Sequence, residues 1–320
     1  MIKVTYEMPK ENQEGAGSFY QRPLLAYLYA LAKGYSFTPL KNPHSNCHYQ
    51  DKEGEKITQD WEDIFHFLGE PSEPTLPIKR LDDSIELTSE YLYHAPFDLS
   101  HAFLAKMDGA QRKVLLEKIQ TLFKEHILKY PKFNPTKEEG TIIALHLRDR
   151  SKGDPKFSKK TLLDWQMFSI EYGLPDNNPD YYSRLYAHAI NKIVSENVIA
   201  KPILHLHSTG EEKSFKQLFS LLDKKIEVKL FLSTHPPASF LDLVRSDYLI
   251  ASHSSFSWLA SLLHTGPTFI RGNFRHFVTP KTQFIEEVLY KDKDRFTRIL
   301  TALDMKIKYQ LFKWRYRYAR

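Results

Sequence analysis

The chain has 320 residues, of which 42% are hydrophobic and 26% are charged. A chain of this length and composition folds and is large enough for two domains, so an intrinsically disordered protein is excluded. The net charge of +6 permits an anionic ligand or surface without identifying one.

Three absences narrow the cellular setting. Cys47 is the sole cysteine, so the chain has no intramolecular disulfide and no cysteine-based metal cluster. The first residues, MIKVTYEMPKENQ, lack the apolar core of a signal peptide, and no run approaches the roughly 18 apolar residues of a membrane span. We therefore expect a reducing compartment and a cytoplasmic location.

In the first half of the chain, short strands alternate with helices. Strands are predicted at residues 2–6, 35–39 and within 80–93, and helices at 19–31, 61–68 and 111–130. The sequence GAGS, which contains Gly15 and Gly17, separates the first strand from the first helix. Glycines here favour a turn in which the backbone approaches a ligand closely, although they are equally usual in a plain turn.

A polar segment with two prolines, residues 131–140, predicts a domain boundary. We therefore expect an N-terminal domain over residues 1–135 and a C-terminal domain over residues 136–285. A helical tail is predicted beyond them, over residues 286–320, and its helical pattern begins at residue 284. The tail ends in the basic and aromatic sequence LFKWRYRYAR.

In the second half the alternation is clearer. Strands are predicted at residues 141–147, 202–206, 226–232, 248–251 and 268–270, and helices at 180–196, 211–222, 238–245 and 256–264. Strands that alternate with helices at this spacing predict an α/β fold with a parallel, doubly wound sheet. In such sheets, ligands bind at the carboxyl ends of the strands.

Polar residues follow two of these strands. His146 and Arg148 end the strand at 141–147, and Arg148 is placed to clamp a diphosphate with its guanidinium group. His207 and Thr209 follow the next strand, where they can contact a ribose or a base. The alternatives are a solvated charged turn at the first position and a helix cap at the second.

A third polar group, SHSSFS at residues 252–257, lies between a strand and a helix. Serine hydroxyls and the free N–H groups of a helix N-terminus suit a phosphate, so Ser254, Ser255 and Ser257 are candidate ligands for one. Serine is also among the preferred helix caps, and capping is the alternative. The ends of the three strands together predict one binding cleft.

Three stretches resemble motifs of the superfamily of α1,2-, α1,6- and protein O-fucosyltransferases. HLRDRSKGD is similar to its HxRRGD-type motif, ASHSSFSWLASLL to its NSSFSWW segment, and GAGSFYQRPLLAYLYALA to its N-terminal GxGNQxFQY element. All three lie in the family's order along most of the chain. Asp149 stands where the first motif has its second Arg, and His253 stands where the second motif has Asn.

The resemblance implies a GT-B-like fold, in which two Rossmann-like domains enclose a cleft for a nucleotide-sugar donor. It also implies an inverting glycosyltransferase that needs no metal ion and no other cofactor. Arg148 would contact the donor diphosphate, and His146 would support its loop. The other expected donor-binding residues are Gly15, Gly17, His207, Thr209, His253, Ser254, Ser255 and Phe256.

The expected donor is GDP-fucose or a related GDP-sugar, and the expected acceptor is a glycan or a lipid-linked hydroxyl. As the acceptor attacks the anomeric carbon, Arg148 and a helix N-terminus would stabilise the leaving diphosphate. A carboxylate would act as general base. Asp154 and Asp149 are the candidates in the loop after Arg148, and Glu11 and Glu14 are the candidates from the facing domain.

Other functions are alternatives: transfer from a UDP-sugar, or binding of a nucleotide or sugar without catalysis. A nucleic-acid binder is not expected, because the basic residues are scattered and interleaved with acidic ones. The basic tail suits a peripheral contact with an anionic membrane near a lipid-linked acceptor. Alternatively, the tail is a helix packed across the domains.

Overall fold

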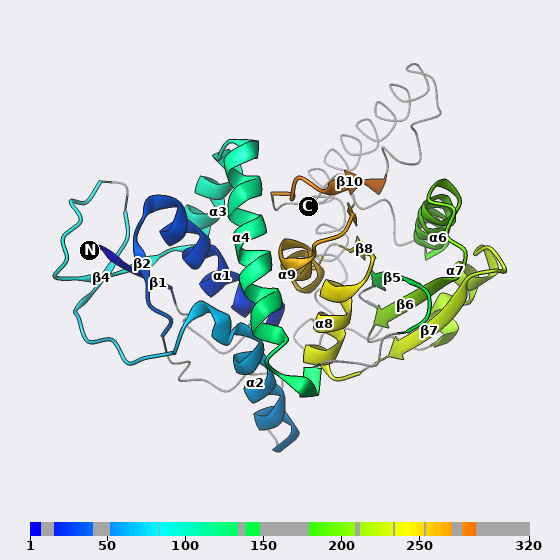
Figure 1. The fold of residues 1–320 in the computed structure, drawn as a ribbon, viewed down its shortest axis with the longest axis horizontal. Coiled ribbons are helices and arrows are strands. Elements are labelled where there is room, and N and C mark those ends of the chain that lie inside the picture. Colours follow the sequence, from blue (N-terminus) through cyan, green and yellow to red (C-terminus); the bar gives the residue numbers. More distant parts are fainter. Residues whose placement is uncertain are drawn as a thin grey trace, which may run out of the picture.

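The computed structural model describes residues 1–7, 16–40, 52–82, 84–133, 138–147, 179–208, 212–232, 234–252, 254–270 and 277–285. Within them the chain forms two parallel β-sheets, one in each half, with helices packed between and around them (Figure 1). This arrangement confirms the predicted fold class, an α/β chain of two parallel units in the manner of GT-B folds.

The N-terminal sheet has the strand order β2-β1-β4-β3, and all its strand pairs are parallel. Its strands are β1 (Lys3–Tyr6), β2 (Ser36–Phe37), β3 (Ile78–Arg80) and β4 (Leu92–Ala95). β1 is a central strand, and its side chains from Val4 to Tyr6 are buried. Its β-branched and aromatic residues suit a strand with neighbours on both sides.

The helices of the N-terminal half carry most of its hydrophobic core. They are α1 (Ala16–Lys33), α2 (Lys52–Phe65), α3 (Phe97–Lys106) and α4 (Gly109–Ile127), with the short 3-10 helices η1 (His66–Leu68) and η2 (Pro131–Phe133). α1 buries Leu24, Leu25 and Leu28 completely. α4 begins after Asp108, whose carboxylate accepts hydrogen bonds from the backbone N–H of Ala110 at 2.9 Å and Gln111 at 3.2 Å.

This half differs from the sequence prediction in several places. The helix predicted at 61–68 begins already at Lys52 as α2, and the region 80–93 is flanked by two strands, β3 and β4, that extend beyond it at its two ends. α1 begins at Ala16, so Gly17 lies in the first turn of a helix and not in a turn before residue 19. Glycine costs a helix roughly 1 kcal/mol relative to alanine, and burial of the α1 leucines contributes more than this, so the helix can include Gly17. α3 was not predicted, because this ten-residue helix directly follows Pro96 and its apolar periodicity is weak.

The C-terminal sheet has the strand order β10-β9-β8-β5-β6-β7, again with all pairs parallel. Its strands are β5 (Thr141–His146), β6 (Pro202–Ser208), β7 (Glu227–Leu232), β8 (Tyr248–Ala251), β9 (Thr268–Ile270) and β10 (Thr282–Phe284). Numbered from β5, this order reads 6-5-4-1-2-3, which is the dinucleotide-binding arrangement of doubly wound sheets. The chain reverses its direction of winding between β5 and β8.

Helices cover both faces of the C-terminal sheet. They are α6 (Pro179–Glu196), η4 (Glu212–Phe215), α7 (Lys216–Ser220), α8 (Pro236–Arg245) and α9 (Ser255–Leu263). Ile143 and Leu145 of β5 pack with the side chains of α6 and α7, whereas Ala144 shares a core with α8 and α9. Strand alternation therefore directs Ala144, and with it His146, to the α8 and α9 face.

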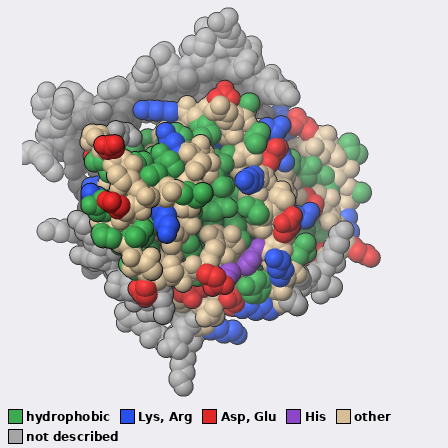
Figure 2. Space-filling model, turned by 60° about the vertical axis from the view of Figure 1, so that its left-hand side comes forward, with side chains coloured by type: hydrophobic (Ala, Val, Ile, Leu, Met, Phe, Trp, Pro, Cys, Tyr) green, Lys and Arg blue, Asp and Glu red, His purple; other side chains and the backbone are tan. Residues whose placement is uncertain are grey.

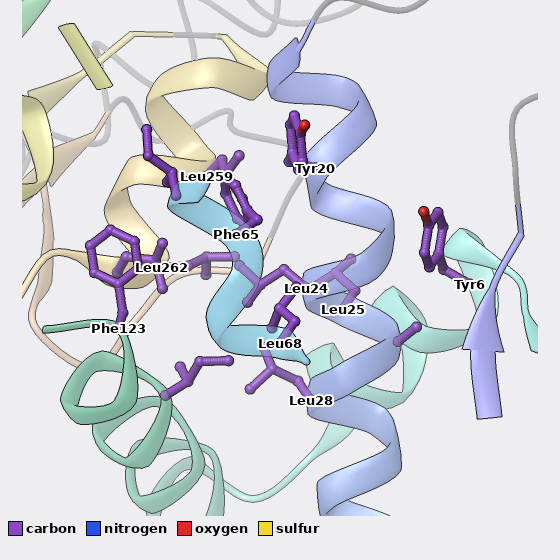
Figure 3. Close-up of a cluster of buried hydrophobic side chains, with 14 of the residues drawn as sticks. Tyr6, Tyr20, Leu24, Leu25, Leu28, Phe65, Leu68, Phe123, Leu259 and Leu262 are labelled. Carbon is purple, nitrogen blue, oxygen red and sulfur yellow. The ribbon is translucent and has the colours of Figure 1, made fainter. Parts of the chain in front are cut away.

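The α8 and α9 face of the C-terminal sheet packs against the N-terminal half. The two share one hydrophobic core, in which Leu259 and Leu262 of α9 meet Leu24 of α1 and Phe123 of α4 (Figure 3). β10 was not predicted, because a three-residue edge strand has too short a pattern to be recognised, and it ends at residue 284, where the predicted helical pattern begins. The rest of the predicted tail lies outside the described residues.

Candidate functional site

The carboxyl ends of β5 and β8 meet at the point where the strand order reverses. β5 pairs with β8 through Leu145 and Ile250, and the two strands end at His146 and Ala251. In open α/β sheets the crevice outside this point is where ligands bind. The fold therefore places the first and third of the predicted strand ends at one site.

His146 links the ends of the two strands. Its Nδ1 lies 3.2 Å from the Oγ of Ser252, which follows β8 directly. Its ring also lies 5.1 Å from the ring of Phe256 in the first turn of α9. The prediction that His146 supports the loop after β5 stays a prediction, and the structure adds that its ring also contacts the segment after β8.

The serine-rich segment builds the start of α9. Ser254 is the N-cap residue, and its Oγ accepts a hydrogen bond from the backbone N–H of Phe256 at 3.2 Å. The Oγ of Ser257 donates to the carbonyl of Ser252 at 3.0 Å. The capping interpretation of Ser254 is thus confirmed, and phosphate binding by this segment stays a prediction. The two roles are compatible, because the N-terminus of a capped helix still carries the positive end of its dipole.

Two buried glutamines from the N-terminal half hold α9 at its two ends. The Nε2 of Gln21 in α1 donates to the carbonyl of Ser255 at 2.8 Å. The Nε2 of Gln120 in α4 donates to the carbonyls of Leu262 at 3.1 Å and His264 at 2.9 Å. The last carbonyls of a helix have no partner within it, so Gln120 caps α9 from the other half of the molecule. These bonds fix α9 relative to α1 and α4.

Replacing Gln120 with alanine is expected to lower the free energy of unfolding by about 1–3 kcal/mol, because two buried carbonyls lose their donor. Urea denaturation followed by circular dichroism measures the change. Gln111→Ala, on the exposed side of the same helix, is the matched control and should stay within about 0.5 kcal/mol of wild type. Equal losses in the two variants would contradict the capping role of Gln120.

His207, expected to contact a ribose or base, lies in a buried cluster of charged groups. Its Nε2 is 2.6 Å from Oδ2 of Asp242 in α8, and the same oxygen lies 2.8 Å from Nδ1 of His205. Nε2 of His205 lies 3.3 Å from Oε2 of Glu138, which also accepts from Nζ of Lys229 at 2.7 Å. Both histidines are only 2% exposed. A contact between His207 and a donor stays a prediction.

The cluster shifts the protonation of its members. Burial alone would raise the pKa of the Asp242 carboxyl, but the hydrogen bonds from the two histidines hold it well below its usual range. Burial would lower the pKa of the His205 imidazole, because it disfavours the charged form, but the carboxylates of Asp242 and Glu138 together raise this pKa. Asp242 is therefore a carboxylate, and His205 is biased toward the imidazolium form.

Several predicted site residues lie outside the described part of the chain. They are Glu11, Glu14, Gly15, Arg148, Asp149, Asp154, Thr209 and His253. Gly17 is located in the first turn of α1, whose residue Gln21 contacts the start of α9. The structure thus brings α1, His146, Ser254, Ser255 and Phe256 toward one region, and the roles assigned to them stay predictions.

Sequence reasoning did not single out Gln21, Gln120 or Asp242. For Asp242 a signal existed, since an acidic residue lies between two leucines in the apolar helix that follows β7. Such a carboxylate on a buried face requires a charged or hydrogen-bonding partner. For the two glutamines no comparable signal existed, because their partners lie more than 100 residues away in the sequence.

The face of the N-terminal half in Figure 2 has hydrophobic side chains at its centre and a mixture of acidic and basic side chains around them. On the described part of this face the charges are therefore of mixed sign, unlike the single-sign basic surface typical of nucleic-acid binding. Among the helices in the described ranges, none combines the length and the apolar character needed to cross a membrane.

The sequence matches no protein-family model and no curated protein. Similar solved structures include crystal structures of POFUT1, a protein O-fucosyltransferase. A complex with GDP has a TM-score of 0.38 at 11% identity, covering 85% of this chain and 99% of that chain. A complex with GDP-fucose has a TM-score of 0.36 at 11% identity, covering 88% and 97%. These scores assign no family to the chain, so the fold description rests on its own two sheets.

Proposed function

We propose that this protein is an inverting glycosyltransferase that transfers a sugar from a nucleotide-sugar donor to a hydroxyl group of a glycan or lipid-linked acceptor. The observation that carries the proposal is the switch point of the C-terminal sheet. There, His146 at the end of β5 contacts Ser252 after β8, beside the capped N-terminus of α9. Each of the three motifs that resemble those of fucosyltransferases has a described residue close to this point, namely His146, Ser252 and Gln21.

We propose GDP-fucose or a related GDP-sugar as the donor. In the transfer step the acceptor oxygen forms a bond to the anomeric carbon, and the bond from that carbon to the diphosphate oxygen breaks. Arg148 and the N-terminus of α9 offset the negative charge that develops on the leaving diphosphate. Asp154 or Asp149 takes the proton of the acceptor hydroxyl. The proposal assigns no metal ion to this step.

A thermal-shift experiment with GDP, UDP, CMP and dTDP in metal-free buffer tests donor binding. GDP is expected to raise the melting temperature, because a ligand that binds only the native state stabilises it. Arg148→Ala is expected to abolish this shift and to lower the rate of sugar transfer by about 100-fold or more. Arg184→Ala, an exposed arginine of α6 on the opposite face of the sheet, is the control and should behave as wild type.

Each other outcome has a definite meaning. A shift with UDP alone would replace the GDP-sugar donor with a UDP-sugar. Nucleotide binding without transfer to glycan or lipid-linked acceptors would identify a binding protein without catalysis. The absence of a shift with all four nucleotides would contradict the assignment of a donor site to the switch point.

A further inference from the structure

The cluster of His205, His207 and Asp242 lies on the α8 and α9 face of the C-terminal sheet, one strand away from His146. The two histidines are two residues apart on β6, so their side chains point to the same face. His207 pairs in register with His146, and His205 pairs with Ala144. Asp242 reaches the same place from α8. Three side chains from two elements thus meet beneath one helix.

The atoms of this cluster are those that hold transition-metal ions in proteins. One ligand atom from each of His205, His207 and Asp242 lies within 4.8 Å of the other two. The nitrogens that face the carboxylate are Nδ1 of His205 and Nε2 of His207. Two imidazoles and one carboxylate are a common set of protein ligands for zinc, which is typically four-coordinate. Both histidines are 2% exposed, so packing against their neighbours holds the two imidazole rings in position.

The surroundings also match those of a metal site. An imidazole that binds a metal usually donates its other N–H to a carboxylate, which fixes the ring and its tautomer. Nε2 of His205 faces Glu138 at 3.3 Å, and Lys229 holds that carboxylate at 2.7 Å. His207 differs in this respect, because its Nδ1 has no hydrogen-bond partner among the described residues, and its ring is held instead by stacking on Phe231 with centroids 4.8 Å apart and planes at 12°. The side chain of Asp242 is 25% exposed, which leaves an entry path from solvent.

We propose that His205, His207 and Asp242 bind one divalent transition-metal ion, with zinc as the expected metal. The ion takes the place of the protons on Nδ1 of His205 and Nε2 of His207. His205 keeps its proton on Nε2, donated to Glu138, and His207 carries its proton on Nδ1. A water molecule completes a tetrahedral set of ligands.

The expected role of this ion is structural. It joins α8 to β6, and α8 packs against α9 and α2. The ion therefore stabilises the position of the two helices that separate the C-terminal sheet from the N-terminal half. This inference does not rest on the donor nucleotide, because zinc binding is argued and measured without it. Of the three ligands, His207 is also an expected donor-binding residue.

The test uses protein first treated with EDTA and then dialysed free of it. Calorimetric titration with ZnCl2 is expected to show one saturable site per chain and to raise the melting temperature. Titration with Co²⁺ is expected to give the visible absorption bands of a tetrahedral ion. His207→Ala and Asp242→Asn are each expected to weaken binding by at least about 100-fold, since each removes a ligand. Glu138→Gln, which leaves the ligands in place, is expected to weaken it by about 10-fold.

His66→Asn is the matched control, because His66 forms a histidine–carboxylate pair at 2.7 Å with Glu70 on the exposed surface. It should bind zinc as wild type does. If wild-type protein shows no saturable Zn²⁺ or Co²⁺ binding, the cluster is a hydrogen-bonded ion network only, and the proposal is wrong. Equal weakening in His66→Asn and His207→Ala would also overturn it. Glu138 is 29% exposed, so its variant tests the site even where a ligand variant fails to fold.

Discussion

Replacing Trp61 with alanine is expected to lower the free energy of unfolding by about 3–5 kcal/mol. Trp61 lies in α2 and is fully buried. Its ring stacks with that of Tyr20 of α1 at 5.3 Å, and it also contacts Phe240 of α8 at 5.1 Å and Phe256 of α9 at 6.0 Å. One side chain therefore joins helices of both halves of the molecule. Removing it leaves a cavity where the two halves meet.

Urea denaturation of Trp61→Ala, Trp61→Phe and wild type measures this effect. Trp61→Phe keeps an aromatic ring and should lose less stability than Trp61→Ala. Val114→Ala is the control for a deletion at the surface, since Val114 is 66% exposed, and it should stay within about 0.5 kcal/mol of wild type. A loss below about 1 kcal/mol in Trp61→Ala would show that the contact between the halves does not depend on this residue.

Replacing Gly266 with alanine is expected to lower the free energy of unfolding by about 3 kcal/mol. Gly266 lies in the turn between α9 and β9. A Cβ atom there would overlap the backbone oxygen of Asp247 and come within 2.9 Å of Nε2 of His264. Both neighbours are fixed. Asp247 leads directly into β8, and Nδ1 of His264 is hydrogen-bonded to the carbonyl oxygen of Val244 at 3.0 Å. The backbone must therefore move.

Gly109→Ala makes the same chemical change without the clash. Gly109 is the first residue of α4, and an added Cβ atom meets nothing within 4 Å. The free energy of unfolding of this control should lie within about 1 kcal/mol of the wild-type value, and we expect it to be slightly higher. Thermal and urea unfolding of the two variants measure the contrast. Equal stability of Gly266→Ala and Gly109→Ala would contradict the close packing of this turn.

Local patterns in the sequence predicted most of the helices and strands. The strands from β5 to β9 and the helices between them follow from apolar runs and helical periodicity, which depend on neighbouring residues alone. The cap at Ser254 follows in the same way, since a serine before a helix satisfies its first N–H groups. Two missed elements, α3 and β10, are short, and their patterns are too weak to be recognised without their packing partners. The start of α2, residues 52–60, was also missed, because its sequence is mostly polar.

The site was predictable only in part. Because the carboxyl ends of parallel strands lie on one edge of a sheet, the sequence could indicate that His146 and the serine segment lie near one another. It could not give the strand order that makes β5 and β8 direct neighbours, nor the contact of His146 with Ser252 across 106 positions. Pairing between strands depends on how the whole chain packs.

The amino-acid sequence by itself determined the α/β alternation, the capped start of α9 and the motifs that suggest a donor site. Only the tertiary structure decided that Gln21 and Gln120 hold the two ends of α9. It also decided that His205 and His207 meet Asp242 beneath α8. The physical reason is common to both cases: periodicity and capping act between residues a few positions apart, whereas buried polar groups find their partners only when distant segments pack together.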